Sequence, residues 1–234
     1  VIDYWFKKRK EFKQLMIKNG KEGNKEQYAL YDLYQQVMKV FLNSIYGSLG
    51  LVSFRYSDGK DYLASAITAA GRLTIMKSAD WVNDWLHYNF EPNSDDIKDY
   101  VLMSDTDSLY IDSGAILRHN KIDISNDDLV VETLRKVFKT ISEELNSYYK
   151  TFTKERFNSD NNRLKIKSET IGKKLYISAK KQYAQYIVDK EGVAVKSVTI
   201  KSVAKLLGDD SQYKDSFVNG TLTHSLLKVS DYHR

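Results

Sequence analysis

The sequence predicts an α+β fold, and three patterns in its 234 residues predict it. Apolar residues recur at spacings of three and four through most of residues 1–88, as in helices that bury one face. Two short apolar runs, 100–103 and 109–111, flank a pair of acidic residues, which is typical of a β-hairpin. Apolar and polar residues alternate from residue 164 onward, which indicates an antiparallel sheet.

Residues 1–18 and about 25–44 are expected to form two antiparallel helices joined by the polar turn at 19–24. Gly47 and Gly50 are expected to end the second helix. The remaining expected elements are a short extended piece at 51–57, a helix over 60–88 that ends near Pro92, the hairpin at 100–112, a helix that begins at 125–128, strands at 164–167, 174–177 and 183–188, and a turn at 189–192.

Composition narrows the class of protein. There is no cysteine, which excludes a disulfide framework and a zinc–thiolate site. No apolar run is long enough to cross a membrane, so we expect a cytoplasmic protein, in the host cell cytoplasm if the source is viral. The net charge of +5 is compatible with a nucleic acid partner. Because the chain opens abruptly inside a helical pattern, we expect it to be a piece of something longer.

Asp105 and Asp107 stand two residues apart between the two apolar runs of the hairpin. Two negative charges at one turn cost stability unless a cation is held there, and carboxylate oxygens are ligands that hard divalent cations prefer. The alternative is a polar hairpin tip, because Asp, Ser and Thr favour turns in any case.

Basic residues lie four apart on each of the first two helices. Arg9 and Lys13 share one face of the first, and Lys39 and Asn43 share one face of the second. Two such helices could bring three cations and an amide to one triphosphate. The alternative is that these lysines simply face water. Tyr46, next to a glycine, could stack on a sugar or base, or could be a buried tyrosine over a helix C-cap.

The later strands carry further lysines. Lys173 and Lys174, then Lys180 and Lys181, could bind phosphates, and Tyr183 could stack on a sugar. The alternative is that these lysines protect a sheet edge from aggregation. Glu169 is an acid in a basic segment, where it could simply balance charge.

Taken in order, these motifs resemble those of family B DNA polymerases, with phage replicative polymerases most similar. The resemblance covers roughly residues 1–205 and rests on Arg9 and Lys13, on Lys39 followed by Asn43-Ser44-Ile45-Tyr46-Gly47-Ser48-Leu49-Gly50, on Phe54-Arg55-Tyr56, on Asp105-Thr106-Asp107-Ser108, and on Lys180-Lys181-Gln182-Tyr183. It implies a helical-hairpin fingers domain at 1–45, a palm at 46–190 with an antiparallel sheet backed by helices, and the palm end and start of a thumb at 191–234.

The resemblance also implies partners and roles. The partners would be dNTP, primer–template DNA and two Mg²⁺ ions, and the reaction would be nucleotidyl transfer to the primer 3′-hydroxyl. Arg9, Lys13, Lys39, Asn43 and Tyr46 would bind the nucleotide; Gly47, Lys180, Lys181 and Tyr183 would contact DNA; Asp105 and Asp107 would be catalytic and, with Glu169, would hold metal.

The sequence departs from the family pattern at three places. Met103-Ser104 replaces the usual Tyr-Gly, and Gln182 replaces an arginine that would face DNA. The family's other palm aspartate, in an Asp…Ser-Leu-Tyr-Pro-Ser segment, is missing. We therefore expect negligible polymerisation by this polypeptide alone, and activity only with an N-terminal polymerase part that supplies that aspartate. The alternatives are a polymerase homologue that binds nucleic acid without catalysis, and an unrelated basic α+β binding module.

Overall fold

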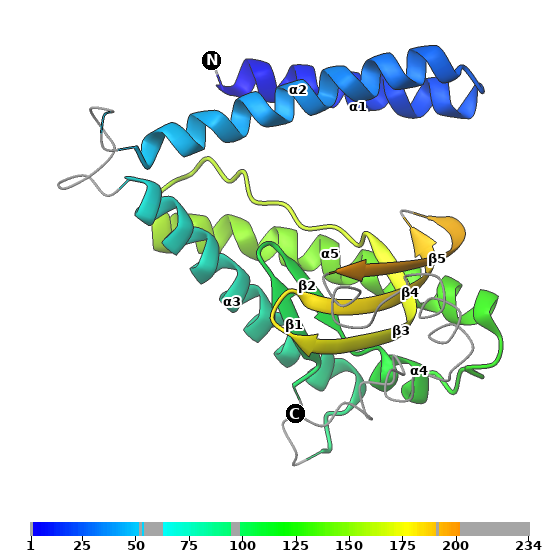
Figure 1. The fold of residues 1–234 in the computed structure, drawn as a ribbon. Coiled ribbons are helices and arrows are strands. Elements are labelled where there is room, and N and C mark those ends of the chain that lie inside the picture. Colours follow the sequence, from blue (N-terminus) through cyan, green and yellow to red (C-terminus); the bar gives the residue numbers. More distant parts are fainter. Residues whose placement is uncertain (1, 52, 54–62, 95–98, 191, 202–234) are drawn as a thin grey trace. The chain divides into compact units, whose positions relative to one another are not determined.

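The structure is a computed structural model that describes residues 2–51, 53, 63–94, 99–190 and 192–201 (Figure 1). The chain forms two compact units, Val1–Arg72 and Leu73–Arg234, and each is described by itself. Most of the extended piece expected at 51–57, the start of the helix expected at 60–88, and residues 191 and 202–234 of the segment predicted as palm end and start of a thumb lie outside the described residues.

The first unit is built around a helical hairpin, as predicted. Helix α1 (Ile2–Lys21) and helix α2 (Lys25–Leu49) run antiparallel (Figure 1). Their facing sides meet through aromatic rings, with Trp5 and Phe41 5.4 Å apart between ring centroids and Phe12 and Tyr34 5.3 Å apart. The turn uses Gly23 at a φ of 74°, and α2 begins where the Asn24 side chain accepts a hydrogen bond from the Gln27 amide at 3.2 Å.

The end of α2 differs from the prediction. Gly50 caps the helix as expected, but Gly47 lies inside it, together with Tyr46. A glycine inside a helix costs about 1 kcal/mol relative to alanine and does not end the helix by itself. The last turn closes when the Gly50 amide donates to the Gly47 carbonyl at 3.1 Å. The Tyr46–Gly47 pair is therefore held on helical backbone and not in a loop.

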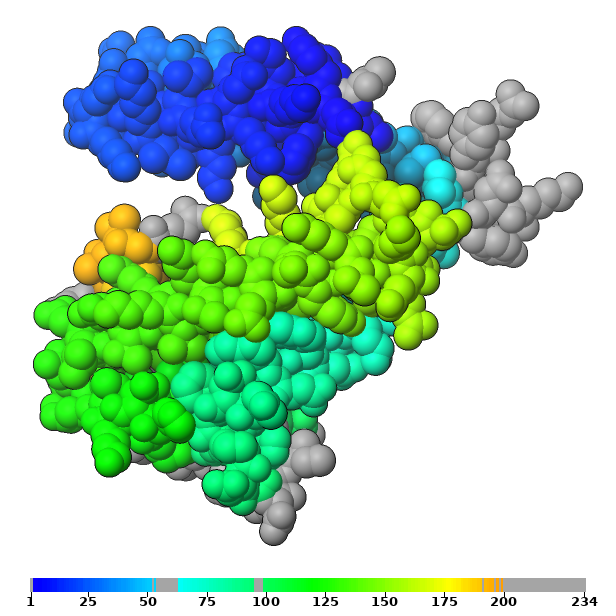
Figure 2. All heavy atoms as spheres, turned by 180° about the vertical axis from the view of Figure 1, so that it is seen from behind, coloured from blue at the N-terminus to red at the C-terminus, as the bar shows by residue number. Residues whose placement is uncertain are grey.

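Two long helices support the second unit. Helix α3 (Leu63–Phe90), from Leu73 onward, packs beside α5 (Asp127–Phe157), and Figure 2 shows them side by side. Three contacts fix the pair: the Ser78 and Tyr149 hydroxyls lie 2.6 Å apart, the Trp85 indole donates to Glu144 at 2.7 Å, and Trp81 stacks on Tyr148 at 6.3 Å. The start of α5 was predicted correctly; Asn126 caps it by accepting from the Leu129 amide at 3.1 Å.

Two antiparallel sheets complete this unit, so the α+β class is confirmed. Strands β1 (Val101–Asp105) and β2 (Ser108–Ile111) form the predicted hairpin, and the short helix α4 (Gly114–His119), which was not predicted, follows it. Strands β3 (Thr170–Ala179), β4 (Gln182–Lys190) and β5 (Val193–Lys201) pair in that order. β5 was not predicted. The core between helices and sheets includes Leu86, Tyr100, Ile116, Leu145 and Ile171.

The strand predicted at 164–167 is not present. Residues 158–169 have no regular structure, although their side chains alternate between exposed and half-buried. The reason is that the backbone of Ile166 pairs with a side chain: Asn146 of α5 donates to its carbonyl at 2.9 Å and accepts from its amide at 2.8 Å. An asparagine amide thus takes the place of a neighbouring strand.

Candidate functional site

The acidic turn between β1 and β2 presents Asp107 to solvent. Asp105 pairs with Ser108 in the antiparallel register, which leaves only Thr106 and Asp107 to make the turn. The Asp107 amide donates to the Asp105 carbonyl at 2.7 Å, and Thr106 between them has a φ of 61°. The Ser108 hydroxyl donates to the same carbonyl at 3.0 Å. Left-handed backbone at a β-branched residue is strained, and such strain concentrates at functional sites.

The base of the hairpin is anchored to α3. Asn83 accepts from the Val101 amide at 2.9 Å, and the Asp112 amide donates to the Tyr100 carbonyl at 2.7 Å. The buried Tyr100 hydroxyl donates to Glu91 at 2.8 Å. Burial, followed by this hydrogen bond to the Glu91 carboxylate, raises the pKa of Tyr100 to about 12. The acidic turn therefore projects from a fixed base.

Tyr110 of β2 and Tyr183 of β4 connect the hairpin to the larger sheet. Their hydroxyls lie 2.7 Å apart, and their rings meet edge to face with centroids separated by 5.3 Å. The Tyr183 hydroxyl also donates to the Asp105 carboxylate at 3.3 Å. Tyr183 is fully buried, with 0% of its surface exposed. A contact between this ring and DNA would need it to leave this position.

One cavity of about 740 Å³ in the second unit is lined by all three predicted acidic residues, Asp105, Asp107 and Glu169. Its walls are largely apolar and come from α5, the β1–β2 hairpin and the segment 165–175. The Asn146–Ile166 hydrogen bonds hold this segment at a point three residues before Glu169. Glu169 is exposed, with a carboxylate oxygen 3.8 Å from the Lys167 ammonium.

The acidic residues fit a metal site in chemistry but not in number. Carboxylate oxygens are what Mg²⁺ prefers, and Asp107 is exposed at the tip of the turn. Within the described ranges, however, no three acidic or histidine side chains are gathered closely enough to hold a metal ion. Asp105 and Asp107 could therefore supply only part of a ligand set.

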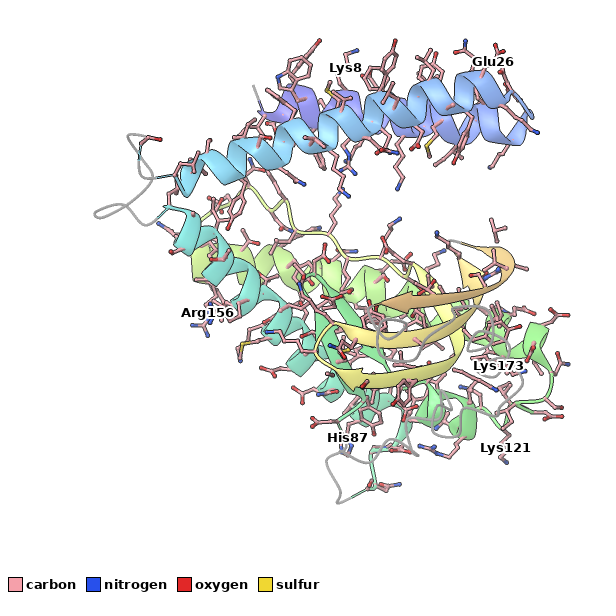
Figure 3. The ribbon with its side chains drawn as sticks, in the orientation of Figure 1. Lys8, Glu26, His87, Lys121, Arg156 and Lys173 are labelled. Atoms are coloured by element: carbon pink, nitrogen blue, oxygen red, sulfur yellow. The ribbon has the colours of Figure 1, made fainter. Side chains whose placement is uncertain are left out.

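The predicted lysines lie at two places in the second unit. Lys180 and Lys181 are exposed and form the turn between β3 and β4, not a strand as expected, and Lys181 has a φ of 61°. Tyr183 follows two residues later, so the basic turn lies close in sequence to the hydroxyl contact with Asp105. Lys173, which is labelled in Figure 3, instead donates to the Asp127 carboxylate at the start of α5 at 2.6 Å.

The predicted nucleotide-binding residues belong to the first unit. Arg9 is half-buried, and its Nε is buried without a hydrogen-bond partner among the described residues. Lys13 of α1 is exposed. The other predicted residues of this group, all exposed on α2, are Lys39, Asn43 and Tyr46. Gly47, which was predicted to contact DNA, is also exposed on α2.

Sequence reasoning did not single out Tyr110 or Asn146. Tyr110 stands in an apolar run, where a tyrosine does not stand out. Asn146 stands in the middle of a predicted amphipathic helix, where it looks like one more polar residue of the exposed face. Alternation does place Tyr110 on the same face of β2 as Ser108. Nothing local indicates which distant groups either residue meets.

Comparison with known sequences gives the family. The sequence model described as DNA polymerase family B matches residues 1–230. The chain belongs to DNA polymerase family B. This confirms the resemblance carried by the fingers, acidic-turn and basic-turn motifs.

The relatives of this family B chain are polymerases of different kinds and from different sources. The DNA polymerase alpha catalytic subunit of Arabidopsis thaliana is 29% identical over 172 residues, covering 74% of this chain and 9% of that protein. The DNA-directed DNA polymerase of Enterobacteria phage T4 is 37% identical over 73 residues, covering 31% of this chain and 8% of that protein. The DNA polymerase of Choristoneura biennis entomopoxvirus is 27% identical over 222 residues, covering 83% of this chain and 22% of that protein.

The chain thus spans 9%, 8% and 22% of the lengths of these three relatives. Because they include a plant, a phage and an insect-virus polymerase, the phage replicative subtype stays a prediction. In the described part of this family B chain, no helix is both long enough and apolar enough to cross a membrane.

Proposed function

We propose that this chain is the fingers and palm part of a DNA-directed DNA polymerase, which adds nucleotides from dNTP to a primer 3′-hydroxyl. The observation that carries the proposal is the acidic turn: Asp105 and Asp107 line a cavity at the tip of a firmly anchored hairpin. Membership of DNA polymerase family B over residues 1–230 supports the same reading.

The basic groups of the chain also support the proposal. Phosphoryl transfer needs positioning and charge neutralisation more than covalent chemistry by the protein. Lys13, Lys39 and Arg9 in the first unit would bind the triphosphate, with Asn43 and Tyr46 shaping the pocket. Lys180 and Lys181, exposed on a turn two residues before a buried tyrosine, would hold the backbone of the primer.

Asp107 and Asp105, with Glu169, which lines the same cavity, would hold Mg²⁺. When bound, two such ions would help deprotonate the primer 3′-hydroxyl and neutralise the triphosphate. Because the described residues gather fewer than three ligands, we propose that another carboxylate comes from an N-terminal polymerase part carrying the family's other palm aspartate. This is the reason to expect negligible activity from the isolated polypeptide.

A primer-extension assay tests the proposal. The 234-residue chain would be assayed alone and together with the polypeptide encoded immediately upstream of it, with Mg²⁺, dNTPs and a labelled primer–template. We expect no extension by either part alone and extension by the two together. Strong extension by this chain alone would contradict the incomplete-site account. No extension by the pair, together with no binding of primer–template, would contradict the polymerase account itself.

The alternative is a polymerase homologue that binds nucleic acid without catalysis, which the small number of gathered ligands favours. It predicts that the pair binds primer–template as tightly as an active polymerase and never extends it. Substitution of Asp107 would then leave DNA binding unchanged and have no reaction to affect.

A further inference from the structure

The Tyr110 and Tyr183 hydroxyls form a pair that ends on one of the two turn carboxylates. Tyr183 contacts both neighbours, at 2.7 Å to the Tyr110 hydroxyl and at 3.3 Å to the Asp105 carboxylate. Tyr183 has no exposed surface, and Tyr110 is half-buried. Two tyrosine hydroxyls from different sheets, one on a fully buried and one on a half-buried residue, therefore meet beside the residue that begins the acidic turn.

The protons of this pair have a fixed direction. An ionised carboxylate can only accept, so the single proton of Tyr183 is directed at Asp105. The Tyr183 oxygen then accepts from Tyr110. A phenol is protonated at neutral pH and can donate; burial, and next the hydrogen bond with Tyr183, raises the pKa of Tyr110 above its usual value. The order of donation is Tyr110 to Tyr183 to Asp105.

The pair also joins the basic turn to the acidic turn. Lys181, with a φ of 61°, ends the basic turn, and Tyr183 is the second residue of β4.

Carboxylates that bind metal are commonly held in place by hydrogen bonds from residues that do not touch the metal themselves. Loss of such a hydrogen bond costs about 10–100-fold in metal affinity or activity.

We propose that Tyr110 and Tyr183 are positioning residues that hold the Asp105 carboxylate in the orientation needed at the acidic turn. The proposal rests on the proposed function and adds to it a role for two residues that would touch neither substrate nor metal. It gives Tyr183 a task inside the protein, in place of the DNA contact expected from the sequence.

The competing explanation is that the two tyrosines only stabilise the fold. The chain offers a matched control for this, the hydrogen bond between the Ser78 and Tyr149 hydroxyls at 2.6 Å. Tyr149 is 4% exposed and lies in the contact between α3 and α5. Tyr149→Phe removes one buried hydroxyl, as Tyr183→Phe does, but it removes it from a pair that contains no carboxylate.

The first readout is the carboxyl carbon resonance of Asp105 by NMR in the full chain without added metal, assigned by comparison with Asp105→Asn. We expect the resonance to move in Tyr183→Phe, to move by less in Tyr110→Phe, and to stay in place in Tyr149→Phe. The double variant should match Tyr183→Phe, because in this proposal the Tyr110 hydroxyl orients Asp105 through Tyr183. A resonance that stays at its wild-type position in Tyr183→Phe would overturn the proposal.

The second readout is the Mg²⁺ concentration that gives half-maximal primer extension by the chain assembled with its N-terminal part. We expect Tyr183→Phe to raise it about tenfold and Tyr149→Phe to leave it unchanged. An unchanged Mg²⁺ requirement in Tyr183→Phe would also overturn the proposal. If the wild-type assembly extends no primer, the proposed function fails, and the Asp105 resonance still decides the role of the hydroxyl pair.

Discussion

The side-chain amide of Asn146 binds both backbone polar groups of Ile166, donating to the carbonyl at 2.9 Å and accepting from the amide at 2.8 Å. Ile166 and Asn146 are both half-buried. Through this pair, α5 fixes a segment without regular structure that leads to Glu169 and one wall of the cavity.

We predict that Asn146→Ala destabilises the protein by about 2 kcal/mol, because it leaves two backbone groups of a partly buried segment without partners. Urea unfolding followed by circular dichroism measures this. Asn89→Ala is the control, since among the described residues that exposed amide bonds the Trp85 carbonyl one turn earlier in the same helix and no backbone group of another segment. Equal effects of the two substitutions would show that the Ile166 contact does not hold the segment.

Thr106 stores strain at the acidic turn, and glycine should release it. Thr106 has a φ of 61°, which glycine adopts at no steric cost. Thr106→Gly should therefore raise the free energy of unfolding by up to about 1 kcal/mol. Thr106→Ala is the matched control, since it removes the same side chain and keeps the penalty of a Cβ. Denaturant titration of both variants gives the comparison. If glycine gains no more than alanine, the turn is not strained.

Tyr100 should make stability fall at alkaline pH. Its pKa of about 12 in the folded protein lies above the model-compound value of 10.0, so the folded state holds the proton more tightly. This contribution is complete below pH 10 and is lost as the pH rises toward 12. Over that window we expect the free energy of unfolding to fall more steeply with pH in the wild type than in Tyr100→Phe. The difference in slope should approach that of one proton, roughly 1.4 kcal/mol per pH unit. Parallel curves would contradict the assignment.

The basic turn should contribute electrostatically to DNA binding. Lys181→Gly removes the charge while it keeps a residue suited to the left-handed backbone. We expect weaker binding of primer–template and a salt dependence reduced by about one unit of log K against log salt. Fluorescence anisotropy over a range of salt concentrations measures both. Lys139→Ala, an exposed lysine of α5 next to Glu143, should change neither, and an equal effect there would indicate only general charge loss.

Periodicity and local chemistry predicted much of the fold. The helical hairpin, the acidic hairpin and the start of α5 each have a short-range signal: spacing of three and four, apolar runs around a turn, and an asparagine cap before two acids. The predicted strand at 164–167 failed because alternation marks an extended chain with one buried side, and cannot tell a strand from a segment paired to Asn146.

The candidate site was predictable in its residue types and not in its supporting contacts. Asp105 and Asp107 stand out because two acids interrupt an apolar run. Tyr183 was noticed for its lysine neighbours and interpreted as a DNA contact that could stack on a sugar, whereas its ring is fully buried. Its partner Tyr110 lies 73 residues away in sequence. No local pattern carries information on a contact of that range.

Asp107→Ala tests most directly whether the acidic turn is, as we propose, the catalytic turn of a polymerase. The variant would be assembled with the N-terminal part and assayed for primer extension beside Asp160→Ala, an exposed acid paired with Lys154 at 3.2 Å. We predict that Asp107→Ala slows extension by at least about a hundredfold, because several kcal/mol of metal-borne charge stabilisation is lost, while Asp160→Ala extends normally. Unchanged extension by Asp107→Ala would contradict the account.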